Sequence, residues 1–403
     1  MFNKTLILSA LAAAGLLPAM AAPAIPDCFS DDAKARLQGY QEVEPTENAL
    51  DVVYFIGADR EPVADYERRI SELLLYLQQY YAREMARNGF GYRAFGLIRK
   101  PDGMVDILLV RGKEPGTVYG YENGGAEKSL AEIEEFFKAN PEKKHGAHTF
   151  IIMPTLYDQE YNDDAPGGVP FYGYGKCCFA LDYAHFDIKH LGHSNRHGRL
   201  MTKWYGGFAH ELGHGLNLPH NDGTASQNAA LGTPLMEAGN FTFGTSPTYL
   251  TKASANILDR SETFAPAGDK TAFYGKAKDE PRVSEPSFTY KDGTLRLHFR
   301  MSGQCDHVNA YVQDPPYVVN RDYDAVAFTG EMGEPAADGS REVQITIPRA
   351  ELAELKQDEK QISVYFLQHD GNRFRWNTEW KWSEVPEGSD ITLNPEQPEL
   401  AGY

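Results

Sequence analysis

The chain has 403 residues and a formal net charge of −18 at pH 7. This length is enough for two domains, each with a core of its own. A chain this acidic is repelled by phosphate backbones, so we expect no nucleic-acid partner, and the charge fits the solubility of an exported protein.

An export signal is predicted at the N-terminus, over residues 1–21. Lys4 supplies a positive charge, residues 6–17 form an apolar run, and small residues precede a cleavage site after Ala21. The run is shorter than the roughly 20 apolar residues that cross a membrane, and no other segment approaches that length. We therefore expect a secreted or periplasmic protein with no membrane span. Residues 22–47 show little periodicity and are expected to form an N-terminal arm or leader.

The four cysteines of the chain are Cys28, Cys177, Cys178 and Cys305. An even number in an exported protein predicts disulfide bonds, although four cysteines allow three pairings. A bridge between the adjacent Cys177 and Cys178 would be strained, so we expect their partners at Cys28 or Cys305. In an alternative interpretation, Cys28 is a thiolate that caps a metal ion until the N-terminal segment is removed.

Residues 48–280 predict one domain of mixed helices and strands. Apolar runs indicate strands at 51–57 and 148–157, and two more runs around Pro101-Asp102-Gly103 indicate a hairpin at 95–112.

Four helices are predicted in the same domain from apolar residues at helical spacing. They cover residues 66–90, 127–140, about 200–217 and 246–260. Residues 158–200 are rich in glycine, tyrosine and histidine and lack a sustained period. A connection this long inside a compact domain is usually functional, so we expect it to line a cleft.

The pattern changes beyond about residue 280. Apolar and polar residues then alternate in several short runs, at 287–302, 307–313, 341–348 and 360–382. Asp-Gly pairs at Asp292 and Asp370 indicate tight turns between strands. Residues 281–395 therefore predict a β-sandwich of about 110 residues that folds separately, which makes the whole protein α+β.

The candidate site lies in the stretch HELGHGLNLPH, from His210 to His220. Each helical residue advances about 100°, so His210 and His214 lie on one face, one turn apart. Two imidazoles at that spacing can share a Zn²⁺ ion. Glu211 lies one step round the helix, where a carboxylate reaches a metal-bound water and acts as a general base.

His220 would point away from the metal if the helix continued, because six residues advance it to about 240° round the axis. The sequence indicates that the helix ends and the chain turns back. Gly213 and Gly215 weaken the helix, Asn217 tolerates the left-handed conformation of a helix end, and Pro219 keeps the preceding residue extended. We therefore expect His220 to return as the third ligand.

These residues resemble the metzincin family of zinc endopeptidases, whose signature is HExxHxxGxxH followed by a turn that contains methionine. Asn217 stands where the family has glycine, and the methionine candidate is Met236 in GTPLMEAGN. The resemblance covers about residues 48–280, with specific motifs only in 206–240. It implies a twisted mixed sheet, an active-site helix beneath a cleft, and Met236 below the metal.

The resemblance also implies a reaction. Three histidines leave one zinc position open for water, whose pKa the metal lowers towards about 7, and Glu211 takes its proton during attack on a peptide carbonyl. In some members a tyrosine just after the methionine assists, but Ala238 occupies that place here. A helper would have to come from elsewhere, and the candidates are Tyr172, Tyr174 and Tyr183.

Two alternatives for the metal chemistry remain open. Glu237 follows His214 at a distance used by zinc peptidases whose third ligand is a downstream carboxylate. A second metal ion is the other alternative, because the predicted cleft loop carries a group of potential ligands. These residues are His185, Asp187, His190, His193 and His197.

The leading functional hypothesis is a secreted zinc endopeptidase with one catalytic ion, acting on extracellular proteins. The order of signal, metzincin-like domain and β-sandwich resembles secreted O-glycopeptidases of mucin-degrading bacteria, or the gametolysin-like type, which implies O-glycosylated mucin-type substrates. The alternative is a glycoprotein-binding adhesin with a structural or degenerate zinc site. Glu211 favours the enzyme, because a structural site has no use for that base.

Overall fold

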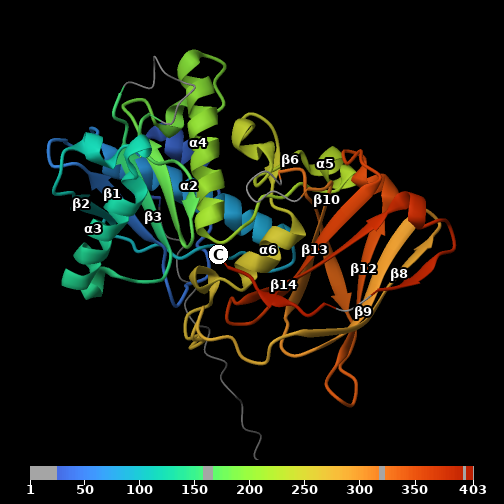
Figure 1. The fold of residues 1–403 in the computed structure, drawn as a ribbon. Helices are drawn as coiled ribbons and strands as arrows, with labels where there is room; N and C mark the ends of the chain where they lie inside the picture. The colour runs from blue at the N-terminus through green and yellow to red at the C-terminus, as the bar shows by residue number, and fades with distance from the viewer. Residues whose placement is uncertain (1–24, 158–166, 317–322, 394–395, 403) are drawn as a thin grey trace, which may run out of the picture.

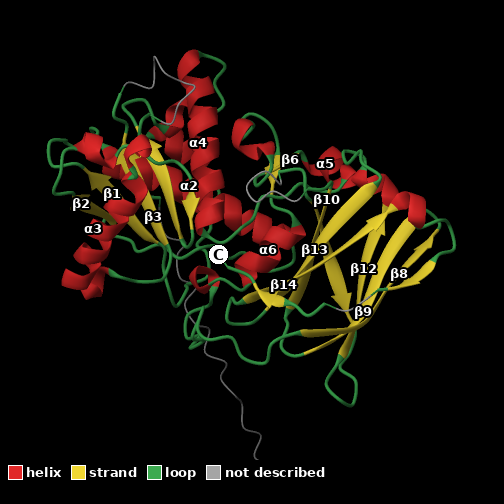
Figure 2. Ribbon diagram, viewed as in Figure 1, coloured by secondary structure: helices red, strands yellow, loops and turns green. Residues whose placement is uncertain are grey.

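The computed structural model describes residues 25–157, 167–316, 323–393 and 396–402, so the predicted signal peptide lies outside the described residues. Two sheets dominate the protein, a mixed one in the first half and a large antiparallel one in the second (Figures 1 and 2). No helix among the described residues is long and apolar enough to span a membrane.

The first sheet has five strands in the order β2-β1-β3-β5-β4. Four strands run parallel, and the short β4 pairs antiparallel with β5 at one edge. The strands are β1 (Asp51–Ile56), β2 (Ile107–Arg111), β3 (Thr149–Pro154), β4 (Gly173–Tyr174) and β5 (Cys177–Asp182). Nearly every residue of β1, β3 and β5 is buried, as expected of parallel strands covered on both faces.

Helices cover both faces of this sheet (Figure 1). The connections from β1 to β2 and from β2 to β3 run in opposite directions across the sheet. Right-handed crossovers therefore place α2 (Tyr66–Arg87) and α3 (Gly125–Ala139) on opposite faces. Packed beside α2 is α4 (Arg196–Gly215), whose Tyr205 hydroxyl donates to the Leu73 carbonyl of α2.

The predicted helices at 66–90 and 127–140 and the strands at 51–57 and 148–157 are confirmed, with ends shifted by a few residues. The apolar side chains that predicted the first helix are all buried on α2. They are Ile70, Leu73, Leu74, Leu77 and Tyr81.

The predicted hairpin at 95–112 is confirmed only next to its turn. The N–H of Lys100 donates to the carbonyl of Met104 and that of Asp106 to the carbonyl of Ile98, around one isolated bridge between Arg99 and Val105, and the pairing does not extend along the two apolar runs. The second run instead becomes β2 and pairs parallel with β1, with Val53 opposite Leu108. Pairing with β1 places this run over the core, where Ile107 and Val110 are buried.

The long loop expected at 158–200 also needs correction, because β5 and the start of α4 lie within it. The run CCFAL before Asp182 is apolar, as a strand buried on both faces requires. Of the rest of this region, residues 158–166 lie outside the described residues.

The N-terminal arm packs on the first sheet's helices. It contains α1 (Asp31–Arg36), whose neighbours Phe29 and Leu37 are buried in the first core. Both the backbone N–H and the hydroxyl of Ser30 donate to the buried carboxylate of Glu72 on α2.

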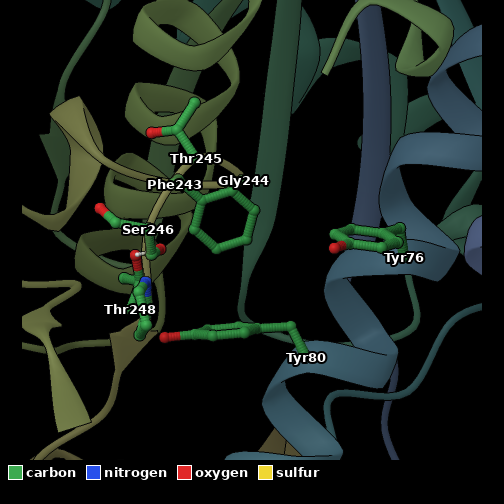
Figure 3. A pocket seen from close by; sticks show the side chains of 8 residues that line it. Tyr76, Tyr80, Phe243, Gly244, Thr245, Ser246 and Thr248 are labelled. Atoms are coloured by element: carbon green, nitrogen blue, oxygen red, sulfur yellow. Dashed lines mark hydrogen bonds between the residues drawn. The ribbon is translucent and has the colours of Figure 1, made fainter. Parts of the chain in front are cut away.

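Several short elements connect the two halves. They are α5 (Ala225–Leu231), the paired β6 (Thr233–Pro234) and β7 (Thr248–Tyr249), and α6 (Lys252–Asp259). The segment before β7 faces Tyr76 and Tyr80 of α2 across a pocket (Figure 3). Residues 252–259 form α6 inside the predicted helix at 246–260.

The second half is one antiparallel sheet of nine strands, in the order β15-β8-β9-β12-β11-β10-β13-β14-β16. The longer strands are β8 (Arg282–Lys291), β9 (Thr294–Ser302), β10 (His307–Gln313), β11 (Val326–Met332), β12 (Arg341–Pro348), β13 (Glu359–Leu367) and β14 (Arg373–Lys381). The short edge strands are β15 (Asp390–Thr392) and β16 (Glu399–Leu400).

A sandwich of two separate sheets was predicted here, and the structure has one continuous sheet instead. It curls so that distant strands face each other: the rings of Phe288 on β8 and Trp380 on β14 are 5.5 Å apart. The sequence analysis missed β11, which joins β12 to β10 and makes the sheet continuous. The predicted turn at Asp292 is confirmed, because Asp292 and Gly293 both have positive φ and connect β8 to β9.

The expected disulfides do not form, and all four cysteines are free. Neighbouring residues of a strand point to opposite faces, so Cys177 and Cys178 on β5 cannot share an environment. Cys178 is buried beneath α4, Cys305 packs against the second core, and Cys28 is exposed beside α1.

Candidate metal centre and active site

The last two turns of α4 carry the first two histidines. The helix begins at the cap residue Asn195, whose side chain accepts the N–H of Gly198, and it ends at Gly215 rather than at the predicted 217. The ring centroids of His210 and His214 lie 4.8 Å apart, as predicted for one face of a helix.

The end of α4 turns the chain back towards these histidines. Asn217 has φ 70°, the left-handed conformation that the sequence predicted. The N–H of Leu218 donates to the carbonyl of Gly213, and that of Asn217 to the carbonyl of His214, which is the Schellman pattern. His220 thereby returns to within 4.5 Å of His214 and 5.2 Å of His210, measured between ring centroids.

Backbone carbonyls set the orientation of the first two imidazoles. Nδ1 of His210 lies 2.7 Å from the carbonyl oxygen of Leu235, and Nδ1 of His214 lies 2.8 Å from that of Leu218. A carbonyl only accepts, so each Nδ1 carries the proton and each Nε2 keeps its lone pair. Burial, with His214 nearby, holds the pKa of His210 well below its usual range, which keeps that ring neutral.

The three rings fit a metal ion. One ligand atom from each histidine lies within 4.8 Å of the others, and the Nε2 atoms of His214 and His220 are 3.0 Å apart. Nε2 of His210 is buried and has no hydrogen-bond partner among the described residues. A buried lone pair without a donor is unfavourable in a finished protein interior, whereas a cation between three neutral imidazoles would satisfy all of them.

The two glycines of the motif have a role that the sequence analysis did not predict. A Cβ atom on Gly215 would lie 2.5 Å from Sγ of Cys178, and one on Gly213 would collide with Sδ of Met236. Both positions therefore require glycine because α4 packs closely, on β5 at one and on Met236 at the other. Met236 is itself buried beneath the helix that carries the histidines.

Glu211 lies beside the histidines and contacts the edge of the first sheet. The backbone N–H of Gly173 on β4 donates to its carboxylate, while burial raises the pKa of Glu211 to about 8. A Cβ atom on Gly173 would collide with Cβ of His214, so the edge strand runs directly against the site.

The three tyrosines considered as catalytic helpers lie in different surroundings. Tyr172 and Tyr174 flank Gly173, and Tyr174 is 45% exposed. Tyr183 is buried, and its ring packs against Phe186 in the core. Because Gly173 faces His214, its neighbours Tyr172 and Tyr174 point to the opposite face of the strand, where Tyr172 packs against Tyr121 and Phe179. The edge strand therefore brings its backbone to the site, and none of the three tyrosine side chains.

Tyr323 lies at the site although the sequence does not predict it there. Its ring stacks on His220, with centroids 3.6 Å apart and planes 27° apart, and it lies 6.0 Å from His210. It lies three residues before β11 and belongs to the second half of the chain. No local pattern marks Tyr323, because only the packing of the two halves brings it to the motif.

Glu237 is not part of the histidine cluster. Its carboxylate is half-buried, and the residue precedes the short helical turn Ala238–Phe241. Cys28, the proposed metal cap, is likewise outside the cluster.

In the described residues, the second group of potential ligands is not brought together as closely as the first. The rings of His185, His190 and His197 do gather, with centroids 4.2 to 6.0 Å apart. Within the described ranges, however, only the cluster of His210, His214 and His220 brings three potential ligand atoms close enough for one ion. Asp187 is paired with Arg68 instead, at 3.3 Å.

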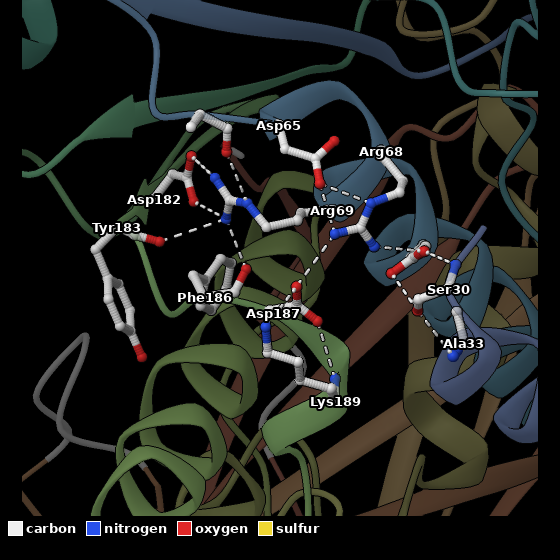
Figure 4. Close-up of polar contacts among 12 residues, drawn as sticks. Ser30, Ala33, Asp65, Arg68, Arg69, Asp182, Tyr183, Phe186, Asp187 and Lys189 are labelled. Atoms are coloured by element: carbon white, nitrogen blue, oxygen red, sulfur yellow. Dashed lines mark hydrogen bonds and ion pairs between the residues drawn. The ribbon is translucent and has the colours of Figure 1, made fainter. Parts of the chain in front are cut away.

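A buried network fixes the segment that leads from β5 to α4 (Figure 4). Arg69 of α2 binds both carboxylate oxygens of Asp182 and the carbonyl of Phe186, and the hydroxyl of Tyr54 donates to Asp182. Because the Arg69 and Asp182 side chains are almost completely buried, losing either partner would leave an unpaired charge in the interior.

No protein-family model matches the chain, and no curated protein matches it. Crystal structures of OgpA from Akkermansia muciniphila do match. Catalytically inactive OgpA in complex with an O-glycopeptide substrate, glycodrosocin, is 46% identical with a TM-score of 0.82, over 89% of this chain and 99% of OgpA.

Wild-type OgpA in two crystal forms gives the same result. The two structures are 46% and 45% identical, with TM-scores of 0.82 and 0.81. The match covers 88% and 89% of this chain and 99% and 98% of theirs. It therefore includes both sheets.

Proposed function

This chain belongs to the family of OgpA from Akkermansia muciniphila, and on that premise we propose that it is a zinc endopeptidase that cleaves O-glycosylated, mucin-type proteins outside the cell. The observation that carries the proposal is the set of three converging imidazoles with Glu211 beside them, in a chain 46% identical to a protein crystallised with an O-glycopeptide substrate. We further propose that residues 1–21 are removed as a signal and that 48–280 form the peptidase domain.

In this proposal His210, His214 and His220 hold the zinc ion, as in metzincins, with Met236 as the methionine beneath it. Two features support this assignment: the backbone carbonyls that orient two of the rings, and the buried Nε2 of His210. A bound zinc ion supplies a Lewis acid that polarises the substrate carbonyl and makes water more acidic.

Glu211 is the proposed general base. It takes the proton of the attacking water and returns it to the amine that leaves. The N–H of Gly173 holds the carboxylate in place, and burial favours its uptake of a proton. The backbone of the edge strand β4 lies against His214, where a substrate chain would pass the histidines.

The test compares an O-glycosylated mucin fragment with its deglycosylated form as substrates for the full-length protein. We expect cleavage of the glycosylated fragment by the wild type. The Glu211→Gln variant should retain zinc and fold but lose roughly 10²–10⁴-fold in rate. Glu135→Gln, which changes an exposed glutamate on α3, is the matched control and should be fully active.

Two results would contradict the proposal. Unchanged hydrolysis by zinc-loaded Glu211→Gln would remove Glu211 from the reaction. Binding of glycoprotein without any cleavage by the wild type would instead support an adhesin.

A further inference from the structure

A pocket of about 370 Å³ lies between α2 and residues 243–248, the segment that leads into β7 (Figure 3). Three aromatic rings form part of its wall, those of Tyr76, Tyr80 and Phe243. Hydroxyl-bearing residues of the 243–248 segment form another part. Of the residues that the structure describes, none with a charged side chain lines the pocket.

The hydroxyl of Tyr80 is the feature of the pocket that suggests a bound ligand. Tyr80 is only 7% exposed, and its buried hydroxyl has no hydrogen-bond partner among the described residues. In Figure 3 its oxygen points across the pocket towards Thr248. Burial raises the pKa of Tyr80, so the phenol stays protonated and can donate. A buried hydroxyl that bonds to nothing is disfavoured unless something in the pocket accepts from it.

Two hydroxyls that can accept hydrogen bonds line the same pocket, with Thr248 opposite Tyr80 and Thr245 further along the segment. The hydroxyls of Thr245 and Thr248 already donate to backbone carbonyls, those of Thr242 and Ser246, so their oxygens remain able to accept. The ring of Tyr80 packs edge-on against Phe243, with centroids 5.1 Å apart, which fixes the direction of its hydroxyl. The pocket therefore offers a fixed donor, hydroxyl acceptors and apolar ring surface within one neutral cavity.

The pocket is separate from the histidine cluster. Tyr205 of α4 contacts both Tyr76 and Phe243, with centroids 6.3 and 5.5 Å away. His210 follows Tyr205 by five residues, and five helical steps turn it about 140° round the axis. The histidines and the pocket therefore lie on different sides of α4.

We propose that this pocket binds a neutral sugar ring of an O-glycan, at a second site outside the catalytic centre. A sugar presents C–H groups that pack on aromatic rings and hydroxyls that both donate and accept, which matches this lining. Among the described residues the wall offers an acidic sugar no ion pair, and the charges that act on Tyr80 from outside it are of both signs, those of Glu84, Arg83 and Arg87. The inference rests on the proposed function for the origin of the sugar, because a glycosylated substrate carries such rings.

The test measures binding to the full-length protein by ligand-observed NMR and calorimetry. The probes are the methyl glycoside of N-acetylgalactosamine, a short peptide carrying the same sugar, the bare peptide and sialic acid. The variants are Tyr80→Phe, which keeps the ring and its packing, and Thr248→Val. Tyr290→Phe, a buried tyrosine of the second sheet, is the matched control.

We expect the wild type and Tyr290→Phe to bind the glycoside and the glycopeptide. Tyr80→Phe should weaken this binding about three- to tenfold, the effect of one hydrogen bond, without a change in thermal stability or in the cleavage rate of a short substrate. Binding that is unchanged in Tyr80→Phe, or equally tight binding of sialic acid, would overturn the proposal. So would a crystal structure at saturating sugar with only water at Tyr80.

This outcome is distinguishable from failure of the proposed function. Sugar binding that depends on Tyr80 in a protein that cleaves nothing would uphold the pocket and overturn the peptidase. Cleavage without any Tyr80-dependent binding would do the reverse.

Discussion

Two of the three imidazoles are directed by backbone carbonyls, and the third lies against the ring of Tyr323. The histidines themselves could be predicted from sequence, because their spacing on a helix and the Asn217 turn are local properties of the chain. Tyr323 could not be predicted, because its position depends on how two distant segments pack.

The ligand assignment predicts different zinc contents for two variants. His220→Ala should lose most of the bound zinc, because two histidines alone hold the ion weakly. Glu237→Ala should keep it, because Glu237 lies outside the cluster. Elemental analysis of the purified variants decides between them. Full zinc in His220→Ala with loss in Glu237→Ala would favour a carboxylate as the third ligand.

Stacking by Tyr323 predicts a second difference. Tyr323→Ala should weaken zinc retention about two- to tenfold, since a stacked aromatic pair contributes about 0.5–1.5 kcal/mol. Tyr323→Phe keeps the stacked ring and should retain zinc normally. The measurement is zinc release to a chelator. Equal retention by the alanine and phenylalanine variants would show that the ring does not support His220.

The sequence predicts the helices that have a clear apolar face, but it does not predict which strands pair. The stripe on α2 is visible in sequence, but the choice of β2 between a hairpin and a parallel partner depends on the crossover helix between them. The apolar run of β5 is short and lies among glycines and tyrosines, which hides it in the sequence. In β11, Gly330 and Glu331 interrupt the alternation that marks the other strands.

The close packing of α4 predicts an unusual effect of alanine. Within a helix, alanine is favoured over glycine by about 1 kcal/mol, yet Gly215→Ala should destabilise the protein by about 1–3 kcal/mol. The added Cβ would meet Sγ of Cys178. Chemical denaturation of Gly215→Ala, Cys178→Ala and the double variant forms the test. If the second substitution failed to relieve the first, contact with Cys178 would not be the cause.

At the scale of the whole molecule, the second sheet is attached to the segment that carries His220. Arg373 of β14 donates to the Asn217 carbonyl, and Asp222 pairs with the backbone of Ala325 and Ala327. An apolar cluster adds to this interface. It contains Ala253, Tyr311, Ala325 and Ala327.

A buried ion cluster at this interface predicts a pH dependence. Burial alone would raise the pKa of Asp259, but the hydrogen bond from His307 of β10, with Arg260 and Arg93, outweighs it and lowers that pKa. A carboxyl whose pKa is lower in the folded state stabilises the fold above its usual pKa of about 3.9 and loses that effect as pH falls.

Asp259→Asn should therefore reduce the free energy of unfolding at pH 7 by about 1–3 kcal/mol. The difference from the wild type should shrink as the pH falls below about 4 and the wild-type carboxyl takes up its proton. Thermal unfolding of both proteins across this range is the measurement. A difference independent of pH would show that the charge of Asp259 is not responsible.

The attachment of residues 217–222 to the second sheet links the docking of that sheet to metal binding at His220. If docking of the sheet brings His220 into place for the ion, then by thermodynamic reciprocity the ion strengthens the docking by the same free energy. A bound metal ion would then stabilise the contact between the two halves of the chain. A chelator would then weaken the contact between the two halves as well as abolish activity. A partner that displaced the second sheet would in turn lower the affinity for the metal ion.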